Sequence, residues 1–78
     1  MENLNLYKEA FVESFEIDIK IVEKLEYQSI EQWDSVGHMV LMSALEEKFD
    51  IMLEMDDIID FSGFERGKEI LSKYDVII

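Results

Sequence analysis

The chain has 78 residues and a formal net charge of −12, from 19 acidic and seven basic side chains. The absence of cysteine excludes disulfides, zinc–thiolate sites and thiol redox chemistry, and the acidity argues against binding to nucleic acid or to an anionic membrane. An apolar fraction of 49% is sufficient for a core, so we predict a single domain over residues 1–78.

The first helix is predicted over residues 4–15, where large apolar side chains recur at helical spacing: Leu4, Tyr7, Phe11 and Phe15. Residues 16–21 alternate between charged and apolar, which is typical of a strand. Because no partner strand is visible, we predict instead an extended part of a long loop that reaches Trp33. A short helical turn is expected at residues 21–25.

The second helix is predicted from Ser35 to Phe49, a stretch that is nearly free of helix breakers. One row of its surface is apolar and consists of Leu41, Leu45 and Phe49. His38 and Met42 lie beside this row. Either Asp34 or Ser35 is expected to cap its N-terminus, since both residue types accept backbone hydrogen bonds there.

Two further helices complete the prediction. Asp56 is expected to cap a short helix that ends at Asp60, with Ile58 and Ile59 facing inward. A serine followed three residues later by glutamate, Ser62 and Glu65, predicts a capping box at the start of the last helix.

The last helix carries an apolar stripe of Phe64, Leu71 and Tyr74. Gly67 lies on this stripe, where it either costs about 1 kcal/mol relative to alanine or permits a close helix crossing. The fold class is therefore all-α. We expect a small antiparallel bundle of three main helices plus one short helix, with a long loop between the first and second helices.

Most catalytic and metal-binding patterns are missing. The single histidine cannot form a histidine cluster, and neither a nucleophile elbow nor a glycine-rich phosphate loop occurs. The acidic stretch 54–57 lacks the spacing of a calcium loop, so we expect no metal site. Ser35 and His38 share a helical face as nucleophile and base would, but no third group is evident to orient them. We therefore predict a protein that is not an enzyme.

Ser35 has a second possible role because of its position. A phosphate esterified to a serine at a helix N-terminus is favoured by free backbone amides and the helix dipole, by roughly 0.3–1 kcal/mol. The simpler alternative is that Ser35 only caps the helix.

The region around Ser35 reads Trp-Asp-Ser-Val-Gly-His at residues 33–38 and Ala-Leu-Glu-Glu-Lys-Phe at residues 44–49. This pattern resembles the acyl carrier protein family, which has Asp-Ser-Leu, several apolar positions, and then Ala-Leu-Glu-Glu-x-Phe. The match runs without a gap from Asp34 to about Phe64, and the length, acidity and helix order also agree.

The resemblance implies that Ser35 carries a covalent 4′-phosphopantetheine arm, transferred from coenzyme A by a phosphopantetheinyl transferase. The thiol of the arm would hold an acyl group as a thioester, and other enzymes with basic docking patches would load and remove it. The family's docking positions match Asp34, Val36, Met39, Val40, Glu46 and Glu47. Its acyl pocket matches Leu45, Leu53, Ile58 and Phe61.

The chain also departs from carriers of fatty-acid synthesis. Gly37 and Val40 occupy positions on the second helix that are usually exposed and acidic, Trp33 replaces a small residue, and Lys48 replaces an acid. A carrier with fewer acids and more apolar surface around Ser35 is expected to serve different partners. The pattern Trp-Asp-Ser-x-x-His at residues 33–38 resembles stand-alone carriers of secondary-metabolite or surface-polysaccharide pathways. The alternative is a small acidic helical adaptor that binds a basic protein and has no arm.

The sequence also suggests a location and an oligomeric state. The N-terminal residues 1–3 lack the pattern of a signal peptide, and the apolar run at residues 35–45 is shorter than the roughly 20 residues that span a bilayer. We expect a cytoplasmic monomer without membrane contact.

Overall fold

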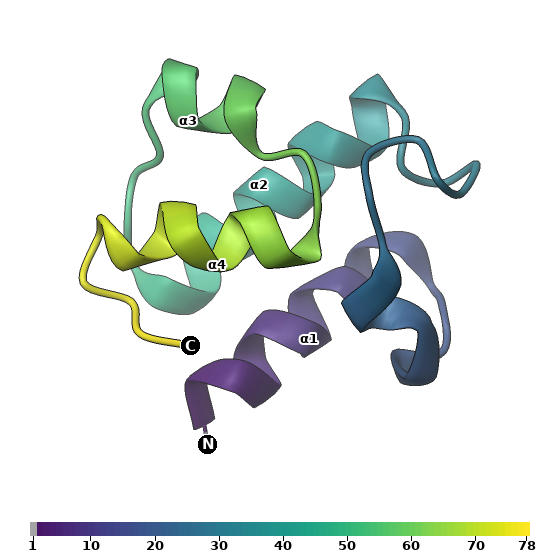
Figure 1. The fold of residues 1–78 in the computed structure, drawn as a ribbon, viewed down its shortest axis with the longest axis horizontal. Coiled ribbons are helices and arrows are strands. Elements are labelled where there is room, and N and C mark those ends of the chain that lie inside the picture. Colours follow the sequence, from purple (N-terminus) through teal and green to yellow (C-terminus); the bar gives the residue numbers. More distant parts are fainter. Residues whose placement is uncertain (1) are drawn as a thin grey trace.

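The computed structural model describes residues 2–78, and within them every regular element is helical. The elements are α1 (Glu2–Phe15), the 3₁₀ helix η1 (Ile19–Lys24), α2 (Ser35–Phe49), α3 (Met55–Asp60) and α4 (Phe64–Ser72) (Figure 1). The one β-type pairing among these residues is an isolated bridge between Glu26 and Gly63. The prediction of an all-α fold is therefore confirmed.

α1 packs against α2 and η1, and η1 also contacts α4. In Figure 1, α3 lies at the top of the view, and the two chain ends lie close together at the bottom. The side-chain amide of Asn3 donates a hydrogen bond to the carbonyl of Ile77 at 3.0 Å, which ties the ends to each other.

Aromatic side chains form the centre of the core. Phe11 of α1 lies edge-on to Trp33, with ring centroids 5.6 Å apart, and 5.4 Å from the ring of Phe64. Tyr7 is fully buried and donates its hydroxyl to the carbonyl of Phe64 at 2.6 Å. Burial raises the pKa of Tyr7, so this hydroxyl keeps its proton. The contact fixes α1 against the start of α4.

Gly67 allows α4 to approach α1 closely. A Cβ atom at this position would overlap the Tyr7 hydroxyl and the ring of Phe61. Of the two roles open to Gly67 from the sequence, the structure therefore supports the close crossing.

The connection between α1 and α2 differs from the prediction. Residues 19–24 form η1, and Asp18 caps it by accepting the backbone N–H of Lys20 at 2.9 Å. The expected extended segment at residues 16–21 is thus wrong over its second half, and the helical turn begins two residues earlier than expected. The alternating pattern misled because Ile19 and Ile21 are both exposed, and Val22 is the buried residue of η1.

α3 also differs in detail. It starts at Met55, whereas Asp56 was expected to be its cap, and Ile59 is 73% exposed where an inward side chain was predicted. Asp57 takes the buried position instead, because Lys73 and Tyr74 each donate a hydrogen bond to its carboxylate at 2.5 Å.

The predicted capping box before α4 does not form. Gly63 is the N-cap residue, and no side chain accepts a hydrogen bond at this end. The backbone N–H of Phe64 donates to the carbonyl of Leu25 at 2.9 Å instead. A tertiary contact with the end of η1 thus replaces the local cap.

Candidate functional site

Ser35 is the first residue of α2, and its side chain is exposed. The Asp34 carboxylate accepts the backbone N–H of Gly37 at 2.8 Å, so Asp34 is the cap of the helix. The Ser35 hydroxyl therefore has no capping role, and it lies 3.2 Å from the hydroxyl of Tyr27.

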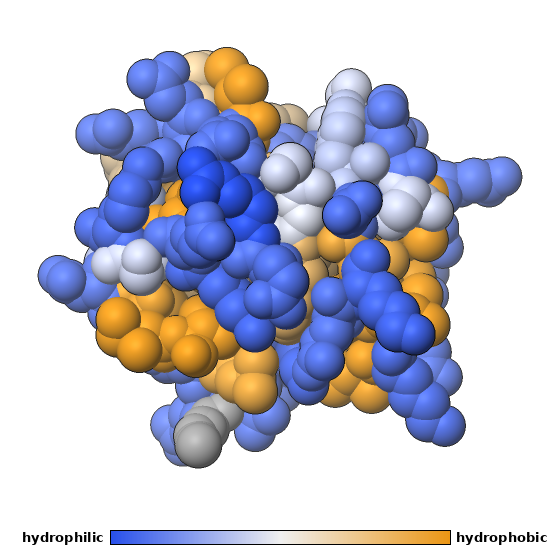
Figure 2. Space-filling view, viewed as in Figure 1, coloured by the Kyte–Doolittle hydropathy of each residue, from blue (hydrophilic) through white to orange (hydrophobic). Residues whose placement is uncertain are grey.

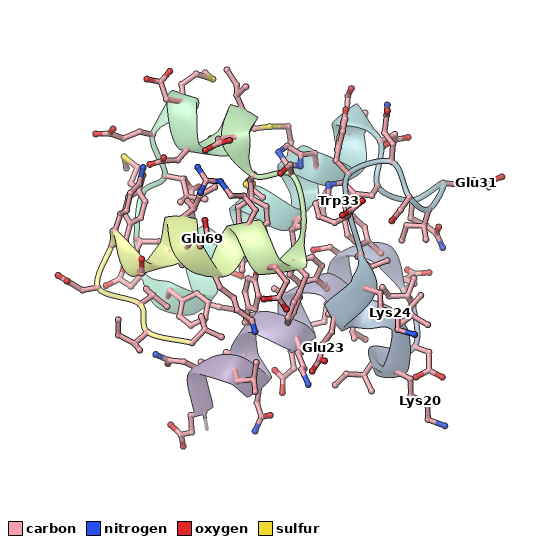
Figure 3. The ribbon with its side chains drawn as sticks, viewed as in Figure 1. Lys20, Glu23, Lys24, Glu31, Trp33 and Glu69 are labelled. Atoms are coloured by element: carbon pink, nitrogen blue, oxygen red, sulfur yellow. The ribbon has the colours of Figure 1, made fainter. Side chains whose placement is uncertain are left out.

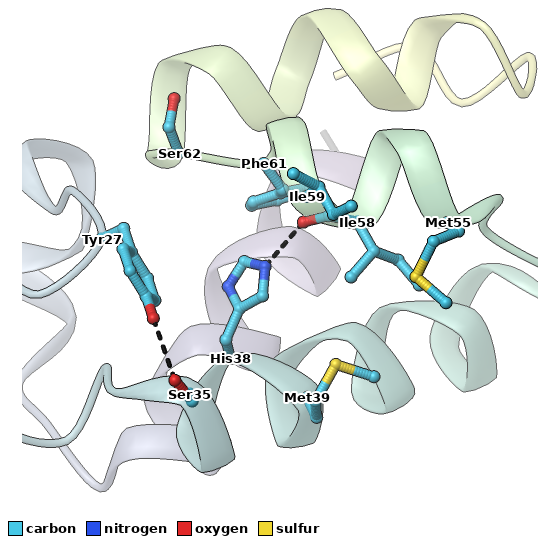
Figure 4. Close-up of a pocket in the computed structure, with 9 residues that line it drawn as sticks. All are labelled: Tyr27, Ser35, His38, Met39, Met55, Ile58, Ile59, Phe61 and Ser62. Atoms are coloured by element: carbon cyan, nitrogen blue, oxygen red, sulfur yellow. Dashed lines mark hydrogen bonds between the residues drawn. The ribbon is translucent and has the colours of Figure 1, made fainter.

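A hollow of about 440 Å³ opens beside Ser35, between α2 and α3 (Figure 4). Its polar lining residues are Tyr27, Ser35, His38 and Ser62. Its apolar lining residues are Met39, Met55, Ile58, Ile59 and Phe61. An exposed serine thus lies at the edge of a mostly apolar hollow.

His38 joins two walls of this hollow. The indole N–H of Trp33 donates to its Nδ1 at 2.8 Å, and its Nε2 lies 2.7 Å from the carbonyl oxygen of Ile58 (Figure 4). Because the indole nitrogen only donates and a carbonyl only accepts, the ring is neutral with its proton on Nε2. Both nitrogens are thus engaged away from Ser35, which leaves no base for the Ser35–His38 pair considered from the sequence.

Trp33 lies beside His38 and holds its ring. The indole is fully buried and nearly parallel to the imidazole, with an interplanar angle of 17° and a centroid distance of 6.1 Å, so the two rings lie side by side along their hydrogen bond. Figure 3 shows Glu31 pointing away from the molecule, whereas Trp33, in the same connection, points inward. Trp33 is therefore a core residue that holds the start of α2.

The four predicted pocket residues divide into two groups. Ile58 and Phe61 line the hollow. Leu45 and Leu53 are buried in the core and do not line it.

Three predicted docking residues are apolar and exposed: Val36 at 74%, Met39 at 50% and Val40 at 47%. Together with Ser35 and Ser43 they form a second, shallower depression on α2. Figure 2 shows hydrophilic side chains over most of one face of the molecule, with apolar areas at the top of the view, where α3 lies, and lower on both sides. The exposed Val36, Met39 and Val40 make the surface beside Ser35 more apolar than the overall charge suggests.

The two predicted docking glutamates differ from each other. Glu46 is half-buried, and its carboxylate accepts the backbone N–H of Leu53 at 2.8 Å. Glu47 is exposed. Glu46 therefore orders the connection between α2 and α3, and Glu47 presents its charge to solvent.

Gly37 does not occupy the exposed position expected of it. It is half-buried, and a Cβ atom there would overlap the backbone carbonyl oxygen of Gln32 and lie 3.3 Å from the ring of Phe15. The absence of an acid at this position follows from packing. Val40, the other position expected to be exposed, is exposed.

Five lining residues were not predicted as site residues: Tyr27, His38, Met55, Ile59 and Ser62. Tyr27 and Ser62 lie outside the helices, where no periodic pattern indicates a direction. Met55 and Ile59 lie on a helix of six residues, too short to define an inward face. His38 was considered only as a neighbour of the apolar row and as a possible base for Ser35, not as a residue that lines a pocket.

No family model, curated protein or solved structure matches the chain. Within residues 2–78, no helix combines the length and apolarity needed to cross a membrane. The same residues contain no group of three or more potential metal-binding side chains from histidine, cysteine, aspartate or glutamate.

Proposed function

We propose that this chain is an acyl carrier, which holds an acyl group as a thioester on a 4′-phosphopantetheine arm attached to Ser35. The observation that carries the proposal is the position of Ser35, exposed at the start of α2 and at the edge of an apolar hollow. The resemblance of residues 33–49 to acyl carrier proteins supplies the chemistry, and the helical fold is compatible with it.

Attachment of the arm requires an accessible hydroxyl. The Ser35 oxygen would form a bond to the phosphorus next to the pantetheine of coenzyme A. The phosphoanhydride bond would break, adenosine 3′,5′-bisphosphate would leave, and a base on the transferase would take the serine proton. Ser35 meets the steric requirement because it is exposed and Asp34 supplies the helix cap.

The hollow suits the apolar part of an acyl group. Its apolar residues come from both α2 and α3, and a volume of about 440 Å³ accommodates a small or medium chain. The chain itself needs no catalytic residues, because the partner enzymes bring their own.

The exposed residues around Ser35 indicate partner enzymes whose docking surface is partly apolar and partly basic. Val36, Met39 and Val40 offer apolar contact area, while Asp34 and Glu47 offer negative charge. Such a surface fits enzymes whose basic docking patch has an apolar centre. Val40 favours a specialised biosynthetic pathway over ordinary fatty-acid synthesis.

The test is incubation with coenzyme A, magnesium and a broad-specificity phosphopantetheinyl transferase, followed by intact-mass measurement. The wild-type chain and Ser43→Ala should each gain one phosphopantetheinyl group, and Ser35→Ala should gain none. Ser43 is a matched control because it is also an exposed serine of α2. An unmodified wild-type chain would contradict the proposal and favour the acidic adaptor without an arm.

A further inference from the structure

Tyr27 is the nearest side-chain partner of Ser35. It lies in the connection between η1 and α2, and its hydroxyl is 3.2 Å from the Ser35 hydroxyl (Figure 4). Its side chain also lines the hollow, so it stands where an arm leaving Ser35 would begin.

The surrounding residues hold Tyr27 in place. Its backbone N–H donates to the carbonyl of Ser62 at 2.9 Å. Its ring lies edge-on to Trp33, at 6.3 Å and 90°, and to His38, at 5.3 Å and 74°. Edge-to-face contacts of this kind fix a ring's orientation. The hydroxyl is therefore directed at Ser35 by a rigid aromatic group, although Tyr27 is 38% exposed.

A phosphodiester on Ser35 would need a hydrogen-bond donor, because the nearest charged side chain is an acid. A phosphodiester on Ser35 would be an anion next to the Asp34 carboxylate, which already takes the backbone N–H of Gly37. Among residues 2–78, no lysine or arginine lines the hollow or the depression on α2. The Tyr27 phenol is an uncharged donor within reach of the same point.

We propose that Tyr27 is a positioning residue, which donates its hydroxyl hydrogen bond to the phosphodiester of an arm on Ser35. This inference rests on the proposed function. It adds to that function the residue that holds the first atoms of the arm. Tyr27 would keep these atoms at the edge of the hollow, where they would otherwise be free in solvent.

The experiment compares wild type, Tyr27→Phe and Ser62→Ala after loading with the transferase. Phenylalanine keeps the ring contacts with Trp33 and His38 and removes only the hydroxyl. Ser62→Ala is the matched control, because it removes another hydroxyl of the hollow and keeps the carbonyl that binds Tyr27. Intact mass first establishes loading, and the ³¹P resonance of the phosphodiester is then recorded for each folded protein and for each protein in urea.

The folded wild type and Ser62→Ala should share a ³¹P shift that differs from the value in urea. Tyr27→Phe should move most of the way to the urea value, with a narrower line, while its circular dichroism stays that of the wild type. The same ³¹P shift in wild type and Tyr27→Phe would overturn this inference and leave the carrier function standing. A wild-type chain that gains no arm would overturn both.

Discussion

His38 connects α2 to α3 through a single side chain. It accepts the indole N–H of Trp33 on one side and meets the carbonyl of Ile58 on the other. The Trp33 ring is fully buried, and His38 is the acceptor of its N–H. An unsatisfied buried donor costs about 1–3 kcal/mol.

We therefore expect His38→Ala to lower the free energy of unfolding by about 1–3 kcal/mol, because it leaves the Trp33 indole N–H without its acceptor. Ser43→Ala, on the exposed face of the same helix, should change it by less than about 0.5 kcal/mol. Urea denaturation followed by tryptophan fluorescence measures both variants. Equal stability of the two would show that the Trp33–His38–Ile58 contacts contribute nothing to the fold.

The roles of some single residues could be predicted from the sequence, and those of others could not. Asp34 was one of two candidate caps, and the apolar row of α2 indicated the buried Leu41 and Leu45. The pairing of Trp33 with His38 crosses the boundary between a connection and a helix. Helical periodicity therefore gave no indication of it.

α3 is a short helix that depends on side chains from its neighbours. Asp57 is buried and takes hydrogen bonds from Lys73 and Tyr74, beyond the end of α4. The Tyr74 hydroxyl also accepts the backbone N–H of Glu54 at 2.9 Å, at the residue before α3. A helix of six residues is not stable by itself, so these contacts hold it in place beside the hollow.

The hydrogen bonds from Lys73 and Tyr74 lower the pKa of Asp57 below its ordinary value. A carboxyl group with a lower pKa in the folded state stabilises the fold above its unfolded pKa, near pH 4. That contribution is lost as the pH falls through the lower, folded value.

We therefore expect the wild type to lose stability below about pH 4 more steeply than Asp57→Asn does. Thermal melts between about pH 2 and pH 7 measure the difference, with Asp56→Asn, an exposed neighbour, as the control. Parallel curves for wild type and Asp57→Asn would contradict the assigned role of Asp57.

We expect the neighbouring acids Glu46 and Glu47 of α2 to have separate roles, one in stability and one in docking. Because Glu46 accepts the N–H of Leu53, Glu46→Lys should lower the free energy of unfolding by about 1–3 kcal/mol. Glu47→Lys should leave stability nearly unchanged and slow association with a basic partner enzyme. Stopped-flow association with the transferase, run beside urea denaturation, separates the effects. A loss of stability in Glu47→Lys with no change in rate would contradict this division.

The elements themselves were largely predictable, and their ends were not. The aromatic residues of α1 and the leucines of α2 repeat at helical spacing, so both helices were placed within a few residues. η1 and α3 are too short for such a repeat. The start of α4 is set by the contact of Phe64 with Leu25, which is distant in the sequence.

The whole molecule carries more negative charge than its ion pairs neutralise. Lys48 lies 3.2 Å from Glu13, Lys8 lies 2.8 Å from Glu23, and Arg66 pairs with Asp60, yet the net charge is −12. The Cα radius of gyration is 11.1 Å, so at a Debye length of about 30 Å every charge interacts with every other. Repulsion across the whole body should therefore oppose folding at low salt.

We expect the melting temperature to rise when sodium chloride increases from about 0.01 M to about 0.15 M, where the Debye length falls to about 8 Å. Each kcal/mol of relieved repulsion should raise it by about 4–8 °C in a domain of this size. Scanning calorimetry measures the shift. A falling melting temperature would show that the ion pairs outweigh the repulsion.

The most direct test of a phosphopantetheine arm on Ser35 is tandem mass spectrometry of the protein purified from its native host. The peptide that contains Ser35 should carry the phosphopantetheine arm, in part with an acyl group on its thiol. Fragmentation should release the arm from that residue and identify the acyl group. A Ser35 peptide that is unmodified in every preparation, or an arm on another serine, would contradict the carrier function.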